Sequence, residues 1–191
     1  QPVAEIAALC RSRGIRLHTD AVQVCGRVPF SLRETPADLV SLSAHKLYGP
    51  QGVGALIVRR GPPRLALEPL LEGGGHEQRL RSGTLPVALI VGFGAACARA
   101  CDLLEVEIPR LTTLRDRLWQ RLQREIPDLV LHGDWMHRLP GNLNVGIPGV
   151  DGDALLAGLR GLAVSSGAAC SSAEPEPSHV LRALGVSDTL A

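Results

Sequence analysis

The chain has 191 residues, and its 20 basic and 19 acidic side chains give a formal net charge of +1 at pH 7. Hydrophobic residues make up 45% and charged residues 20%, a globular composition that argues against a disordered chain. The near-zero charge and an aromatic content of 3% argue against nucleic-acid binding, and the charge argues against an anionic membrane surface. The longest uncharged run, 82–98, is shorter than the roughly 20 apolar residues that span a bilayer and predicts a buried helix.

The order of helical and extended patterns along the first half of the chain predicts an α/β protein. The expected elements are a helix over 3–13 that ends at Gly14, strands over 15–18 and 38–43, a strand over 54–58 buried on both faces, and helical periodicity over 86–107 and 109–125.

The rest of the chain shows weaker patterns. The second helical stretch is expected to carry Leu111, Leu114, Leu118 and Leu122 on one stripe. Apolar segments follow at 129–131 and 142–147, and another helix is expected to begin near Asp151. We place a boundary near residue 105, between an α/β part over 1–104 and a smaller α+β part over 105–191.

Lys46 is the only lysine in the chain, against 19 arginines. A general preference for arginine explains most of this imbalance, yet one lysine has been retained. Because arginine stays protonated and cannot form a Schiff base, it does not replace lysine where a nucleophilic amine is required. Lys46 is therefore a candidate for amine chemistry.

The five cysteines do not form the pattern of a disulfide-stabilised secreted domain, because their number is odd and their spacing irregular. No secretory signal begins the chain, so we expect a reducing, cytoplasmic setting. Cys97, Cys101 and Cys10 lie in apolar segments and are interpreted as packing residues, and Cys25 has no distinguishing neighbours in the sequence. No metal site is predicted from these residues.

Polar side chains follow two of the predicted strands, where open α/β sheets usually bind their ligands. In the segment 18–23, Asp20 either pairs with a cationic ring nitrogen or caps the next helix. In the segment 41–50, Ser43 and His45 can donate hydrogen bonds to a phosphate beside Lys46. An amine, a carboxylate and a phosphate cradle are what pyridoxal phosphate requires, whereas the alternative for 41–50 is a solvated turn.

Two further segments are candidates for chemistry. In the glycine-rich stretch 73–84, Thr84 precedes the long predicted helix and is placed to hold an anion near its N-terminus, although glycines also mark any tight loop. His76, in the same stretch, is equally consistent with a surface histidine. Cys170 lies among small residues and serines, which favour an accessible thiol over a buried one, and the sequence alone leaves both interpretations open.

Taken together, the segments 18–23, 43–46, 73–84, 165–172 and 176–185 closely resemble the cysteine desulfurases of the NifS/IscS-like branch. These belong to the class-V aminotransferase family of fold-type I pyridoxal-phosphate enzymes. The resemblance covers essentially the whole chain and corresponds to the C-terminal half of the family. It implies the last part of the cofactor-binding large domain over 1–104 and a small C-terminal domain with the Cys170 loop over 105–191.

The resemblance also implies roles for individual residues. Lys46 is expected to hold pyridoxal 5'-phosphate as a Schiff base, Asp20 to pair with the ring nitrogen, and Gln23 to contact the ring hydroxyl. The phosphate is expected to be bound by Ser43 and His45, and by Thr84 across a homodimer interface. Cys170 is expected to accept sulfur from L-cysteine as a persulfide, leaving L-alanine, and a transient iron–sulfur ligand role for it stays open.

The family's N-terminal half, with a further phosphate loop and the histidine that stacks on the cofactor ring, is not in this sequence. The arginine that normally binds the substrate carboxylate is also absent, so we expect no turnover by this chain alone. Expected partners are L-cysteine and sulfur-acceptor proteins such as an iron–sulfur scaffold, with no nucleic acid and no membrane. The alternatives are a selenocysteine lyase and a non-catalytic fragment that docks a sulfur-acceptor scaffold.

Overall fold

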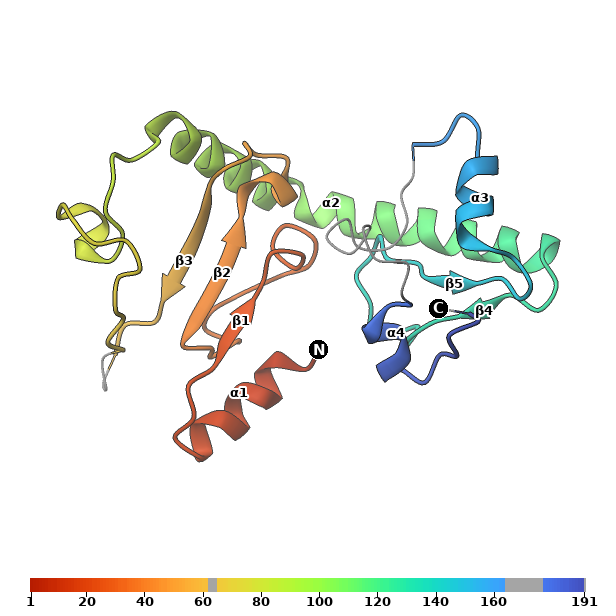
Figure 1. Cartoon of the computed structure of the whole chain (residues 1–191), viewed down its shortest axis with the longest axis horizontal. Coiled ribbons are helices and arrows are strands. Elements are labelled where there is room, and N and C mark those ends of the chain that lie inside the picture. The colour runs from red at the N-terminus through yellow and green to blue at the C-terminus, as the bar shows by residue number, and fades with distance from the viewer. Residues whose placement is uncertain (62–64, 164–176, 191) are drawn as a thin grey trace. The chain divides into compact units, whose positions relative to one another are not determined.

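The computed structural model describes residues 1–61, 65–163 and 177–190, and the chain forms two compact units, Gln1–Arg110 and Leu111–Ala191 (Figure 1). The division between them falls inside one long helix, α2 (Val87–Glu125). The sequence-based boundary near residue 105 lies in the same helix. No loop in the described chain therefore separates the two units.

The first unit is built on a three-stranded mixed sheet, which agrees with the α/β prediction. Its strands lie in the order β1 (His18–Asp20), β2 (Leu39–Ser43) and β3 (Gly54–Val58), with β1 parallel to β2 and β3 antiparallel to it. The remaining elements are α1 (Val3–Ser12), the short 3-10 turns η1 (Ala44–Leu47) and η2 (His76–Arg79), and the first half of α2.

The predicted ends of the first helix and strand can be compared with the structure directly. The helix is confirmed and is followed by Gly14, whose φ of +68° is the left-handed conformation that glycine favours. The strand predicted over 15–18 is displaced, because pairing with β2 begins at His18. Ahead of it, Leu17 is held by a side chain, since its N–H donates to Asp38 Oδ2 at 2.9 Å.

The strands over 39–43 and 54–58 form where the sequence places them, but β3 is not buried on both faces as expected. Leu56 is 52% exposed, and the first three residues of β3 are all exposed. The reason is its position, since β3 is an outer strand of the described sheet and pairs on one side only. An apolar run therefore predicted the strand but not its burial.

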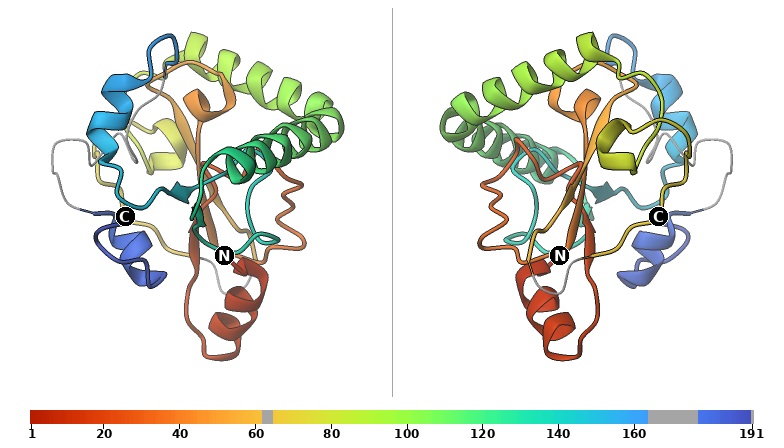
Figure 2. Two further views of the ribbon diagram at one scale, coloured as in Figure 1. Left: turned by 90° about the vertical axis from the view of Figure 1, so that its right-hand side faces the viewer. Right: turned by 90° about the vertical axis from the view of Figure 1, so that its left-hand side faces the viewer.

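The core of the first unit consists of two clusters of small and medium side chains. One contains Ala21, Ala37 and Val40, and lies against the sheet. The other contains Ala44, Leu47 and Phe93, and joins η1 to the first half of α2. Figures 1 and 2 both show η1 beside this part of the helix.

The helix α2 runs unbroken through Pro109 for 39 residues, so the two predicted helical stretches are one element. Its apolar N-terminal part is long enough to cross a membrane by length and composition. The prediction that this part is buried is wrong for the described residues, because 6% of its most apolar window is buried. A helix that contacts a turn along one face leaves its other faces exposed.

The second unit contains a two-stranded antiparallel sheet of β4 (Val130–Leu131) and β5 (Val145–Gly146), with α3 (Gly152–Gly158) and α4 (His179–Ala183). Asp151 caps α3 as predicted, because its carboxylate accepts a hydrogen bond from the Ala154 N–H at 2.8 Å.

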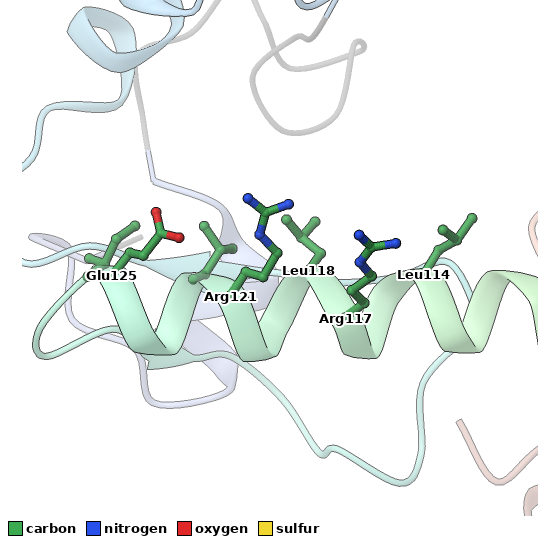
Figure 3. A pocket seen from close by; sticks show the side chains of 7 residues that line it. Leu114, Arg117, Leu118, Arg121 and Glu125 are labelled. Carbon is green, nitrogen blue, oxygen red and sulfur yellow. The ribbon is translucent and has the colours of Figure 1, made fainter.

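The predicted leucine stripe of α2 is only partly correct. Leu114 and Leu118 are 48% and 50% exposed, whereas the Arg115 side chain is 10% exposed and lies 4.6 Å above the Trp135 ring. The packed face is thus displaced toward Arg115, because a guanidinium can stack on an indole and stay solvated at its edge. Leu114 and Leu118 instead line an open groove of about 370 Å³ together with Arg117 and Arg121 (Figure 3).

The contact between Asp38 and the start of β1 predicts a pH-dependent contribution to stability. The Leu17 N–H and then the Arg16 guanidinium lower the pKa of Asp38 below its ordinary value of 3.8. Asp38→Asn is therefore expected to lower the free energy of unfolding by about 1 kcal/mol at pH 7.

That difference should be fully present above pH 3.8 and disappear as the pH falls through the lower pKa of the folded state. Urea unfolding of both proteins across this range measures it. Asp102→Asn, on the exposed surface of α2, is the matched control. A difference that stays constant as the pH falls would contradict the role of the Asp38 charge.

Candidate active site

The carboxyl ends of β1 and β2 carry a polar face. Register pairs Asp20 with Ser41, so the two side chains lie on one side of the sheet, and Ser43 follows two residues later on the same side. His18 belongs to this face as well, because its Nε2 lies 2.7 Å from Ser41 Oγ. The opposite side carries the buried Val40, so alternation along the strand separates core from candidate site.

Asp20 closes a turn at the end of β1. Its Oδ1 accepts a hydrogen bond from the Val22 N–H at 2.8 Å, and the residues that follow form turns instead of a helix. Asp20 therefore accepts a hydrogen bond from the backbone as a cap does, but it caps a turn and not the helix that the alternative interpretation expected. The side chain is exposed, as is that of Gln23 in the same turn.

The turn η1 continues directly from β2 and carries Lys46. Ser43 Oγ lies 2.9 Å from His45 Nδ1, so one hydrogen bond joins the two residues that are proposed to bind the phosphate. The Lys46 side chain is half-buried. Gly54 pairs with Ser43 across β2 and β3, so no side chain from β3 covers that position. The sole lysine, a hydroxyl and an imidazole thus share one end of the sheet with Asp20.

Small residues in this turn and on the facing side of α2 set the position of the turn. The Gly49 N–H donates to the Ala44 carbonyl at 3.0 Å and closes the turn. A Cβ at Gly49 would lie 3.0 Å from that carbonyl oxygen and 3.1 Å from Ala96 Cβ of α2. Tyr48, between Lys46 and Gly49, takes the left-handed conformation with φ of 61°. The chain can reverse after Lys46 because nothing larger than hydrogen occupies position 49.

The other predicted site residues lie elsewhere. Thr84 is exposed on the segment between η2 and α2, and within the described part of the chain it makes no hydrogen bond with Asp20, Ser43 or Lys46. His76 begins η2 and is exposed, in agreement with the surface interpretation. Cys170 falls within 164–176, outside the described residues.

Two members of the polar face had no assigned role at the level of sequence, namely His18 and Ser41. The available signal was the alternation of β2, which puts Ser41 and Ser43 on one side of the strand. His18 could be added only with the register of β1 against β2, which a sequence does not display. Within the described ranges, no group of three His, Cys, Asp or Glu side chains is arranged to hold a metal ion.

Comparison with known proteins assigns the fold and its lineage. The profile described as aminotransferase class-V matches residues 1–189. The chain belongs to the class-V aminotransferase family. Across all 191 residues it is 51% identical to the cysteine desulfurase IscS of Histophilus somni and 47% identical to the cysteine desulfurase of Homo sapiens. It spans about half the length of these curated relatives, 47% and 42% respectively.

A solved structure agrees with the class-V assignment. The NifS-like protein from Rickettsia africae superposes with a TM-score of 0.86 at 32% identity, over 99% of this chain and 49% of that one. The fold is therefore that of the fold-type I enzymes, as the sequence predicted, and enzymes of this family use pyridoxal 5'-phosphate. The side chains at this end of the sheet fit pyridoxal phosphate, because they supply a primary amine, a carboxylate, a hydroxyl and an imidazole.

The close packing of Gly49 predicts that a single methyl group will disturb the Lys46 turn. Gly49→Ala is expected to destabilise the protein by about 1–3 kcal/mol through overpacking, and to speed amide hydrogen exchange over residues 44–49. Gly94→Ala is the matched control, because a Cβ there meets nothing within 4 Å and alanine favours a helix. Equal exchange in the two variants would contradict the role of Gly49.

Proposed function

We propose that this chain forms part of a pyridoxal-phosphate-dependent cysteine desulfurase that converts L-cysteine to L-alanine and passes the sulfur to an acceptor. The observation that carries the proposal is the grouping of side chains at the carboxyl ends of β1 and β2. There the single lysine follows Ser43 and His45 at the same edge of the sheet as Asp20. The identity of 47–51% to proteins named cysteine desulfurase supports the choice of substrate.

Each residue of the sheet edge has a role in this proposal. Lys46 holds the cofactor covalently and, as a free amine, moves the α-proton of the substrate. Asp20 keeps a negative charge beside the ring nitrogen, and Gln23 contacts the ring hydroxyl. Ser43 and His45 bind the phosphate. The cofactor, when bound, supplies an electron sink for the substrate carbon.

The two remaining residues, Thr84 and Cys170, are not part of the arrangement described for this end of the sheet. Thr84 is proposed to bind the phosphate of a second subunit in a homodimer. Cys170 is proposed to attack the substrate sulfur as a thiolate. That attack forms an S–S bond and breaks the Cβ–S bond, whose electron pair stays on carbon and is protonated to give L-alanine. The persulfide then passes to an acceptor protein such as an iron–sulfur scaffold, in the cytoplasm.

The attachment of the cofactor is tested first by intact mass, before and after borohydride reduction of the full polypeptide loaded with pyridoxal phosphate. A reduced adduct localised to Lys46 is expected. Lys46→Arg keeps the charge but cannot form a Schiff base, so it should carry no adduct. An adduct that persists in Lys46→Arg would overturn the assignment of Lys46, and a wild-type protein without adduct would overturn the cofactor site.

The role of Asp20 is tested by Asp20→Asn, which keeps a side-chain oxygen for the Val22 N–H and removes the charge. We expect unchanged thermal stability and a fall in kcat of about 10²-fold or more from lost electrostatic stabilisation. Asp102→Asn is the control, because it removes a charge on the exposed surface of α2, away from the ends of β1 and β2. Unchanged alanine production by Asp20→Asn would contradict the pairing with the ring nitrogen.

A further inference from the structure

Cys25 lies near two cysteines of α2, Cys97 and Cys101, although it is far from both in the sequence. Cys25 lies in the turn after β1, and both it and Cys97 of α2 pack against the cluster of Ala44, Leu47 and Phe93. A Cβ on the neighbouring Gly26 would lie 3.1 Å from the Cβ of Ala100. The turn that carries Cys25 therefore lies directly on the helix between Cys97 and Cys101.

The environments of the three thiols differ in a way that matters for their reactivity. Cys25 and Cys97 are half-buried, and Cys101 is exposed. Burial, followed by the proximity of Cys97 and Cys101, raises the pKa of the Cys25 thiol, and burial also raises the pKa of Cys97. Exposed Cys101 is therefore the thiol that a reagent from solution meets first, whereas Cys25 is placed to react second.

We propose that Cys25 forms a reversible disulfide with α2, through Cys101 or Cys97, in exchange with a small-molecule disulfide such as glutathione disulfide. A link within the helix is disfavoured, because side chains four residues apart on a helix have Cβ atoms about 5–6 Å apart, whereas a disulfide requires about 3.5–4.5 Å. Cys25 lies in a turn and can approach the helix.

The exchange balances in two steps. The Cys101 thiolate attacks glutathione disulfide, forms a mixed disulfide and releases one glutathione thiolate. The Cys25 thiol then loses its proton and attacks the Cys101 sulfur, which forms the protein disulfide and releases the second glutathione thiolate. Two protein thiols are oxidised and one glutathione disulfide is reduced. A further exchange by Cys97 moves the link along the helix without net oxidation.

The disulfide would tie the turn after Asp20 to the helix that supports the Lys46 turn. If the proposed function holds, the oxidised protein should therefore differ from the reduced protein in its affinity for pyridoxal phosphate. The formation of the disulfide itself does not rest on that function, because it depends only on the contact between the Cys25 turn and α2.

The test uses the full polypeptide with Cys170→Ser, so that the proposed sulfur acceptor contributes no thiol. After incubation with glutathione disulfide, mass spectrometry of unreduced peptides should show the loss of two hydrogen atoms and a cross-link from Cys25 to Cys97 or Cys101. Dithiothreitol should reverse it. Cys10→Ser should keep the cross-link, Cys101→Ser should slow its formation, and Cys25→Ser or Cys25→Ala should abolish it.

Two outcomes would overturn the proposal. One is glutathione attached to Cys101 without any cross-link to Cys25, and the other is a link between Cys97 and Cys101. A cross-link that forms normally in a protein unable to bind pyridoxal phosphate would count against the proposed function alone, so the two failures are distinguishable.

Discussion

The contact between the Lys46 turn and α2 is the interaction on which the candidate site depends. Gly49 approaches Ala96 of α2, and Gly26 in the turn after β1 approaches both Leu47 and Ala100, so neither glycine leaves room for a Cβ. Protein interiors are packed densely enough that a single added methyl group at such a contact must displace something. The helix thereby fixes where the chain reverses after β2, and with it the end of the sheet where lysine, serine and histidine gather.

Much of the fold and the site followed from the sequence because both rest on local patterns. Gly14 ended the first helix, Asp151 capped a later one, and the retention of one lysine among arginines singled out Lys46. The polar residues after two strands predicted a shared edge, since neighbouring parallel strands end together. The parallel register of β1 and β2 confirms that juxtaposition, while the roles of individual residues stay predictions.

What the sequence did not show depends on contacts between distant segments. The prediction that β3 and the apolar part of α2 are buried was wrong. The hydrophobicity of a segment indicates that it can be buried, but not which other segment lies next to it. The helix face chosen around Arg115 depends on Trp135, which is twenty positions further along the chain. The meeting of Cys25 with Cys97 and Cys101 is of the same kind, since no pattern near Cys25 announces its neighbours.

The unbroken passage of α2 from one compact unit to the next has a practical consequence for dissecting the protein. Residues 93–100 of the helix support the Lys46 turn, and residues 111–125 belong to the second unit. A cut anywhere between them would leave four carbonyl groups of one fragment and four N–H groups of the other without their helical partners. Fragment complementation at this boundary would thus begin from two frayed ends, whereas a cut between η2 and α2 leaves every helix of the described chain whole.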